Sequence, residues 1–198
     1  MKIDLHVHTK ERSACGRSSE IEQIQAAIDA GLDAIAFTDH ERLAPAKRLV
    51  QLNEIYAPFR IFNGVEININ SEHILVFGIH DSKLESMDWR YPELHAFVRE
   101  RGGLLAVAHP FRFHPELRLD IEHFPPDAVE AYSTSTPLEA AERILNLTAR
   151  LDIPTMSNSD SHVTHTLGKH YNILDRSPAD ISELIEIIRK GQFTKSIP

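Results

Sequence analysis

Two closely spaced pairs of side chains in this sequence could bind metal ions. His6 and His8 lie at the end of an apolar run that begins at Ile3, and Asp160 and His162 lie in the last quarter of the chain. Side chains two residues apart on a strand point to the same face, so each pair could hold one ion together. Imidazole and carboxylate groups suit zinc, manganese and iron. The two pairs therefore predict metal chemistry.

Three further segments carry the same residue types after apolar, β-branched runs. They are Thr38-Asp39-His40, Gly64-Val65-Glu66 and Ala108-His109-Pro110. One histidine beside a strand is more often a hydrogen-bonded structural residue than a ligand. Burying so many imidazoles and carboxylates together would be costly unless cations compensate them, so the whole set indicates a metal site. Glu66 could bridge two ions, because a carboxylate has two oxygens.

Strand-like runs alternate with helical segments, which is typical of β-α units around a parallel sheet or barrel. The pattern predicts a helix from the capping box of Ser19 and Glu22 to the stop signal at Gly31. Further helices are expected at 43–52, 92–102, 138–151 and 179–190. Strands are expected at 3–7, 34–37, 60–69, 74–79, 104–108, 129–132, 154–156 and 171–174, and the third and fourth could form a hairpin.

About seven strands in a chain of this length predict an α/β fold, a small distorted (β/α)7-type barrel with its active site at the carboxyl ends of the strands. The composition, 42% hydrophobic and 25% charged, fits one domain spanning residues 1–198. A net charge of −8 argues against a general affinity for long nucleic acid or anionic membranes.

The sequence contains one cysteine, Cys15, so it predicts no intramolecular disulfide. It has neither a signal-peptide pattern nor an apolar run long enough to cross a bilayer, so the cytoplasm is the expected location. The expected partner is a small phosphorylated substrate, and the sequence carries no signal for oligomeric state.

Six sequence blocks resemble those of the PHP family (polymerase and histidinol phosphatase), in the same order and at similar spacing. They are DLHVHT, FTDH, GVEI, EHILVFGI, AHP and NSDSH, and together they cover nearly the whole chain. The resemblance implies a distorted seven-stranded β/α barrel that holds two to three divalent ions, with zinc, manganese and iron as the candidates.

The resemblance also implies ligand sets. A first metal would bind His6, His8, Glu66 and Asp160, and a second would bind the bridging Glu66 with His73 and His109. A third would bind His40, His162 and a residue of the loop after His8, where family members often have Asp or His. That loop has neither here, so Glu11 or Cys15 could substitute, or water could complete the site; Cys15 could equally be a small packed residue.

Phosphate recognition requires cations near the metals. Arg112 is the first candidate, because a guanidinium can contact phosphate oxygens through two N–H groups. Arg17 and Lys169 are further candidates, and each of the three could instead be a solvated surface charge. Asp39 is expected to orient His40 rather than to bind metal itself.

Together these residues predict a metal-dependent phosphatase acting on small phosphomonoesters. A metal-bound hydroxide would attack phosphorus, Glu66, Asp160 and Arg112 would be catalytic, and Asp160 or a bound water would carry the proton to the leaving group.

Three alternatives stay open. A phosphodiesterase or exonuclease acting on short oligonucleotides would use the same metals. Amidohydrolases also have an early His-x-His, but a lysine usually bridges their metals where this chain has Glu66. A non-catalytic, metal-stabilised module is supported only by the missing loop ligand.

Overall fold

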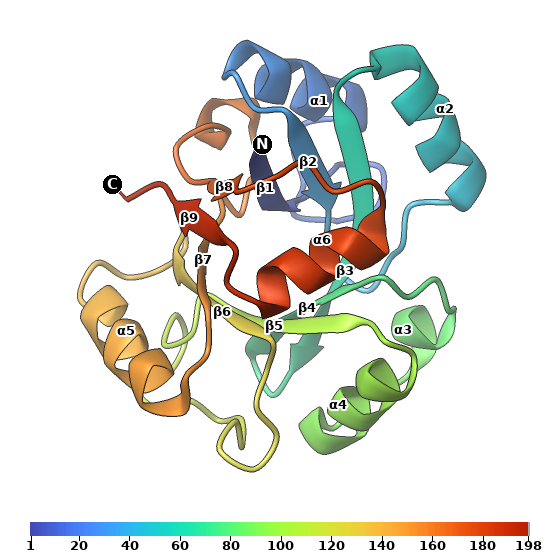
Figure 1. Ribbon diagram of the computed structural model, residues 1–198. Coiled ribbons are helices and arrows are strands. Elements are labelled where there is room, and N and C mark those ends of the chain that lie inside the picture. Colours follow the sequence, from blue (N-terminus) through green and yellow to red (C-terminus); the bar gives the residue numbers. More distant parts are fainter. Residues whose placement is uncertain (198) are drawn as a thin grey trace.

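The computed structural model describes residues 1–197 as a nearly closed barrel of nine strands with helices around its outside (Figure 1). The elements in chain order are β1 (Lys2–Val7), α1 (Glu20–Asp29), β2 (Ala34–Phe37), α2 (Ala46–Tyr56), β3 (Arg60–Ile69), β4 (Glu72–Phe77), α3 (Lys83–Ser86), α4 (Tyr91–Glu100), β5 (Leu104–Ala108), β6 (Ala128–Tyr132), α5 (Ala140–Leu151), β7 (Thr155–Ser157), the 3₁₀ turn η1 (Thr164–Thr166), β8 (Asn172–Leu174), α6 (Ile181–Arg189) and β9 (Phe193–Lys195). Among these residues, no helix is both long and apolar enough to cross a membrane.

The strands follow the order β7-β6-β5-β4-β3-β2-β1-β8-β9. β1, β2 and β3 pair in parallel, as do β5, β6 and β7, whereas β4 runs antiparallel between β3 and β5. The carboxyl ends of six strands therefore point to one end of the barrel. The predicted barrel and the suggested hairpin of β3 with β4 are confirmed. The strand count is nine rather than about seven, partly because the short β9, with the sequence FTK, has no apolar run to reveal it.

The opposite end of the barrel is closed by α6, which lies across the centre of Figure 1. Leu184, Ile185, Ile187 and Ile188 are buried in one cluster with apolar side chains of eight strands, β1 to β8. Arg60, at the start of β3, donates to backbone carbonyls just before α6, which fixes this helix at the amino ends of the strands. Burial of this face drives the packing of the helix, because each fully buried aliphatic side chain contributes roughly 1.5–3 kcal/mol.

An irregularity in β1 positions the first histidine. Asp4 pairs with Ile35 and Val7 with Phe37, so three steps along β1 match two along β2. The extra residue is a bulge, which redirects the side chains beyond it. As a result Leu5 joins the apolar cluster around α6, whereas the next residue, His6, faces the polar end of the barrel.

Side-chain and backbone hydrogen bonds close the barrel between β7, with the segment that follows it, and the neighbouring strands β8 and β1. The amide of Asn172 on β8 replaces a strand ladder: its Nδ2 donates to Ser157 O at 2.9 Å, and Ser157 N donates to its Oδ1 at 3.0 Å. Beyond β7, Ser161 N donates to His6 O and His8 N donates to Ser161 O. These bonds fix the segment after β7 against the carboxyl end of β1.

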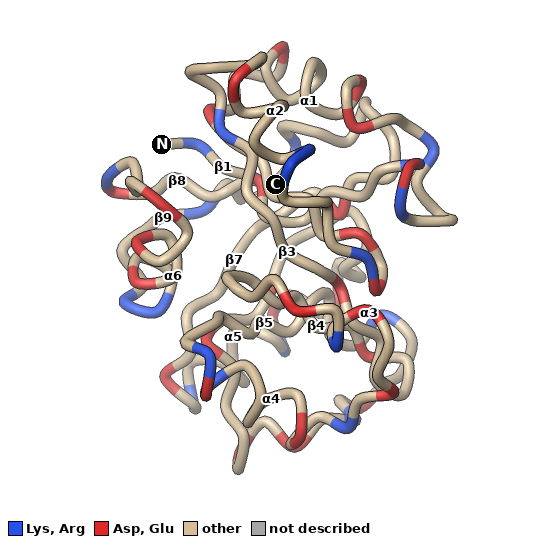
Figure 2. The backbone as a smooth tube through the Cα atoms, turned by 90° about the vertical axis from the view of Figure 1, so that its right-hand side faces the viewer, with Lys and Arg blue, Asp and Glu red and all other residues tan. Residues whose placement is uncertain are grey.

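Charged residues of both signs are interspersed over the surface. Figure 2 shows Lys and Arg alternating with Asp and Glu along the outer helices and loops, rather than gathered into one basic face. The formal net charge of the chain is −8.

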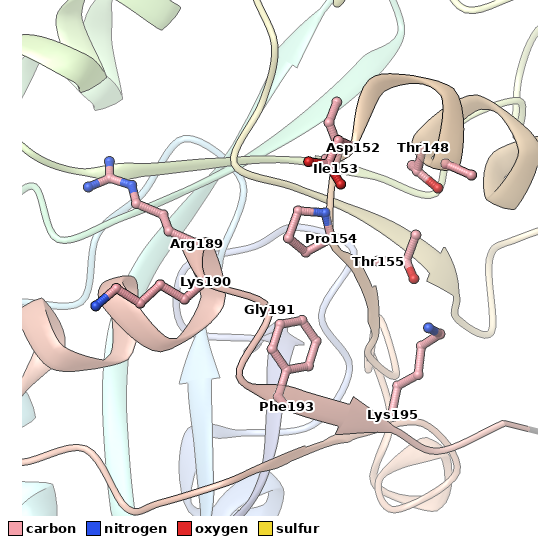
Figure 3. A pocket seen from close by; sticks show the side chains of 11 residues that line it. Thr148, Asp152, Ile153, Pro154, Thr155, Arg189, Lys190, Gly191, Phe193 and Lys195 are labelled. Carbon is pink, nitrogen blue, oxygen red and sulfur yellow. The ribbon is translucent and has the colours of Figure 1, made fainter.

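A pocket of about 400 Å³ lies among α5, α6 and β9 at the closed end of the barrel (Figure 3). Arg189, Lys190 and Lys195 line it. However, Arg189 is paired with Asp127 and Lys190 with Glu186. Two of its three cations are therefore already engaged, so this pocket offers little charge to an anionic ligand.

We expect Asn172→Ala to lower the free energy of unfolding by about 2–4 kcal/mol, because it leaves the buried N–H and C=O of Ser157 without partners. Urea unfolding followed by circular dichroism measures the change. Asn146→Ala, at an exposed position of α5, is the matched control and should shift stability by less than roughly 0.5 kcal/mol. Equal midpoints for the two variants would contradict the role given to Asn172.

Candidate metal centre

All eight ligands implied by the resemblance gather at the open end of the barrel. They are His6 and His8 at the end of β1, His40 after β2, Glu66 on β3, His73 on β4, His109 after β5, and Asp160 and His162 after β7. Six of these eight side chains are buried: His6, His8, Glu66, His73, His109 and Asp160. Clusters drawn from these eight residues and Cys15 place three or four metal-binding atoms within 4.8 Å of one another.

The innermost group, called here the first position, consists of His6, His8, Glu66 and Asp160. His6 Nε2 and His8 Nε2 lie 3.0 Å apart, and each is 3.1–3.3 Å from Glu66 Oε2 and 3.2–3.3 Å from Asp160 Oδ1. Ligand atoms about 2.0–2.2 Å from a shared ion lie roughly 3.0–3.5 Å from each other. Asp160 Oδ1 is also buried without a hydrogen-bond partner. Both the spacing and this unpaired oxygen fit a bound cation.

The second position uses the other oxygen of Glu66. Oε1 lies 2.7 Å from His73 Nδ1 and 3.3 Å from His109 Nε2, whereas Oε2 faces the first position. One buried carboxylate thus presents its two oxygens to two separate sets of imidazoles. This is the arrangement expected of a ligand that bridges two ions.

The acids and histidines of the first position shift one another's pKa values. Burial lowers the pKa of His8, but the facing carboxylates of Asp160 and Glu66 outweigh it and raise that pKa to about 9. Burial likewise opposes charge on Glu66 and Asp160, yet the facing His6 holds both pKa values well below their usual range. Protons on the histidines therefore balance the carboxylates, and a divalent cation can replace those protons.

Glu130 is a buried hydrogen-bond partner of His6, and it is not among the residues predicted from the sequence. Its Oε2 accepts from His6 Nδ1 at 3.0 Å and from Asn158 Nδ2 at 2.9 Å, and the side chain is fully buried. A carboxylate on one imidazole nitrogen fixes the tautomer and leaves the other nitrogen for a metal. Asp4 adds a second buried support, since it accepts from His6 N, and burial raises its pKa to about 7. The available signal was a carboxylate between apolar residues, in Ile3-Asp4-Leu5 of β1 and in Val129-Glu130-Ala131 of β6.

Asp39 has a different role from the one expected. Its carboxylate accepts from Thr9 N at 2.6 Å, Arg12 Nε at 2.7 Å and Ser13 Oγ at 2.8 Å. These bonds fix the loop after β1 and do not reach the ring of His40. Ser13 Oγ in turn accepts from His40 N at 2.9 Å, so Asp39 acts on His40 only through this loop.

The three candidate phosphate-binding cations differ in position. Arg112 reaches the centre, with Nη1 3.3 Å from Asp160 Oδ2, and its side chain stays 33% exposed. Arg17 adjoins the centre through its backbone N–H, which donates to His162 O, while its side chain is exposed. Lys169 is exposed in the segment after η1. The geometry therefore favours Arg112 among the three, and all three stay predictions.

The chain's family follows from its match to a known domain. Residues 4–194 match the PHP domain. The chain belongs to the PHP domain family. This family membership covers nearly every element described above, from β1 to β9. No curated protein matches the chain.

Solved structures share the fold of this PHP domain at low sequence identity. A protein from Bifidobacterium adolescentis assigned as a metal-dependent phosphoesterase is 18% identical, with a TM-score of 0.64 over 84% of this chain and 88% of that one. A two-domain protein from Bacteroides vulgatus, containing a predicted PHP-like metal-dependent phosphoesterase, is 15% identical with a TM-score of 0.72, over 100% of this chain and 64% of that one. An amidohydrolase from Chromobacterium violaceum, with bound sulfate and no metal, is 17% identical with a TM-score of 0.63, over 81% of this chain and 87% of that one.

We expect Glu130→Gln to weaken metal binding about 10–100-fold, because the neutral amide no longer stabilises the tautomer and charge of His6. Competition with a chromophoric chelator measures the affinity. Glu54→Gln, at an exposed position of α2, is the matched control and should leave it unchanged. Equal affinities for both variants would show that Glu130 does not support the site.

The metal-free domain should become less stable as pH rises from about 6.5 to about 9. The pKa of His8 is raised to about 9 in the folded protein, so its contribution is full below its usual value of 6.5 and is lost as pH rises through the folded value. Melting temperatures of chelator-treated protein test this. Zinc should reverse the loss, because metal binding replaces the protons. A melting temperature that stays constant or rises over this interval would refute the expectation.

Proposed function

We propose that this PHP domain hydrolyses phosphate esters with bound divalent metal ions, and that small phosphomonoesters are its substrates. The observation that carries the proposal is Glu66, whose two oxygens face two sets of histidines within one buried cluster. When bound, two bridged divalent ions polarise a phosphoryl oxygen and lower the pKa of water enough to supply hydroxide near neutral pH. Family membership and the folds of the phosphoesterase neighbours add support.

Arg112 is proposed to orient the phosphoryl group. Its guanidinium contacts Asp160 on one side and remains partly exposed on the other, so free N–H groups can meet a dianionic phosphate. Phe113, which is 50% exposed, lies with its ring 5.5 Å from that of His73 and could wall the space for the leaving group. The low pKa of Asp160 disfavours it as a proton carrier, so we assign it to positioning Arg112 and to metal binding.

The interspersed surface charge favours a small substrate over a polymer, because a long nucleic acid needs a continuous basic surface (Figure 2). Hydrolysis of short oligonucleotides uses the same groups and is the nearest alternative. Amide hydrolysis is the second candidate, since one structural neighbour is an amidohydrolase. Against it, the family resemblance assigns the bridging position to Glu66, where amidohydrolases usually have a lysine.

A substrate panel tests this proposal. Metal-loaded protein should release phosphate from one or more small monoesters, and Glu66→Gln should lower the rate by at least about 100-fold, because it removes the bridging charge. Glu54→Gln is the matched control at an exposed site. Cyclic nucleotides, short oligonucleotides and N-acyl amino acids complete the panel. Silence on all monoesters, with metal content confirmed, would reject the proposal, and turnover of an amide alone would favour the second candidate.

Arg112→Ala should lower kcat/KM for a monoester about 10–100-fold, the amount expected for losing a hydrogen bond to a charged group. Arg112→Lys should restore part of this, because it keeps the charge but not the two-pronged geometry. Arg17→Ala and Lys169→Ala compare the two exposed candidates, and smaller effects are expected from both. If either exceeds the effect of Arg112→Ala, the assignment of the phosphate-binding residue is wrong.

A further inference from the structure

We propose that Cys15 supplies the loop ligand of the third metal position that the family resemblance implies, beside His40 and His162 at the rim of the metal centre, and that its thiolate makes this position selective for ions of the zinc type. This goes beyond the proposed function, because it concerns which ion is bound and would hold whether or not phosphate esters are substrates. The carboxylate-bridged first and second positions contain no sulfur ligand among the residues named above. The third position would therefore differ from them in its chemistry.

The side chains around this position converge from three separate segments. Cys15 Sγ and one ring nitrogen each from His8, His40 and His162 lie within 4.8 Å of one another. The ring of His8 stacks against those of His40 and His162, with centroids 4.7 and 4.3 Å apart. Because His8 Nε2 faces Glu66 and Asp160, the remaining three side chains are the ones left for another ion.

Both remaining imidazoles have a nitrogen free for metal. His162 Nδ1 lies 2.9 Å from the backbone oxygen of Asp160, which places the proton on Nδ1 and the lone pair on Nε2. His40 Nδ1 lies 3.1 Å from Glu66 Oε2, which likewise leaves its Nε2. The two side chains are 32% and 27% exposed, whereas those of the first position are at most 1% exposed. The third position is therefore open to solvent.

The loop after β1 is shaped so that Cys15 stays at this rim. A Cβ added at Gly16 would meet Thr9 C at 2.5 Å, so only glycine allows the loop to fold back this closely. Next to it, Arg17 N donates to His162 O at 2.9 Å, and on the other side Ser13 Oγ accepts from His40 N. Cys15 thus lies between two residues that are hydrogen-bonded to its proposed co-ligands.

Glu11, the other candidate in this loop, is directed elsewhere. Its Oε2 accepts from Glu20 N at 3.0 Å, at the first turn of α1. A carboxylate at a helix amino terminus is stabilised by the helix dipole and by the free N–H groups there. The loop ligand is therefore assigned to Cys15. A thiolate with two imidazoles favours Zn²⁺ and Co²⁺ over Mn²⁺ and Mg²⁺, because the softer ions bind sulfur more strongly.

Cobalt titration tests this assignment directly. As Co²⁺ fills the metal-free wild-type domain, a sulfur-to-cobalt charge-transfer band should appear in the near ultraviolet, and zinc should abolish it. Cys15→Ser should lack the band and bind one ion fewer while keeping its circular dichroism spectrum. A saturated wild-type protein without the band, or equal metal content in the variant, would overturn the proposal.

Thiol reactivity gives a second readout that does not depend on activity. Cys15 is the only cysteine and is exposed, so iodoacetamide should alkylate it in the metal-free protein at alkaline pH, where the thiolate forms although burial raises the pKa of this thiol. Zinc should slow this reaction at least about tenfold, because a bound thiolate is shielded from the reagent. Mg²⁺ should not protect, and His162→Asn should reduce protection by zinc. Equal rates with and without zinc would overturn the assignment, even if the enzyme proves active on phosphate esters.

Discussion

A fully buried carboxylate surrounded by imidazoles sets the terms for the rest of this structure. Glu66 is 1% exposed and contacts histidines that come from both sides of it in the sheet. Such a charge is tolerated only where cations or protons surround it closely. The strands must therefore hold their carboxyl ends a few ångströms apart. The reversed β4 contributes to this, because its amino end lies beside the carboxyl ends of β3 and β5 and brings in His73.

The interior of the barrel is divided into an apolar half and a polar half. Around α6 the buried side chains are aliphatic or aromatic. The buried layer next to the candidate metal ligands instead contains Asp4, Glu130, Asn158 and Asn172. Each of these four makes hydrogen bonds to a neighbouring strand or to a ligand. The polar layer gives the ligands fixed orientations that apolar packing could not, and the apolar half supplies most of the hydrophobic stabilisation.

The ligands and the barrel could be predicted from the sequence because both follow from local patterns. His6 and His8 share a face through the two-residue period of a strand, and most of the other candidate ligands come after apolar runs. His73 instead precedes the apolar run of β4, and only the family resemblance implied it. The roles of Glu130 and Asp4 could not be found this way, because Glu130 contacts His6 and Asp4 contacts Ser159, and both pairs are distant in the sequence. The bulge in β1 depends on its pairing with β2. The expected link between Asp39 and His40 was indirect, because the side chain of Ser13 lies between them.

The closure of the barrel also has a consequence for how the chain folds. The bond from Leu5 N to the side chain of Asn158 joins residues 153 positions apart, and the segment containing Asp160 and His162 packs against the very first strand. Contacts between such distant residues incur a large loop-closure entropy and form slowly. During synthesis, therefore, His6 and His8 emerge long before Asp160, one of the two carboxylates that face them. The candidate metal centre is complete only when nearly the entire polypeptide is available, so an ion that binds there would be captured late in folding.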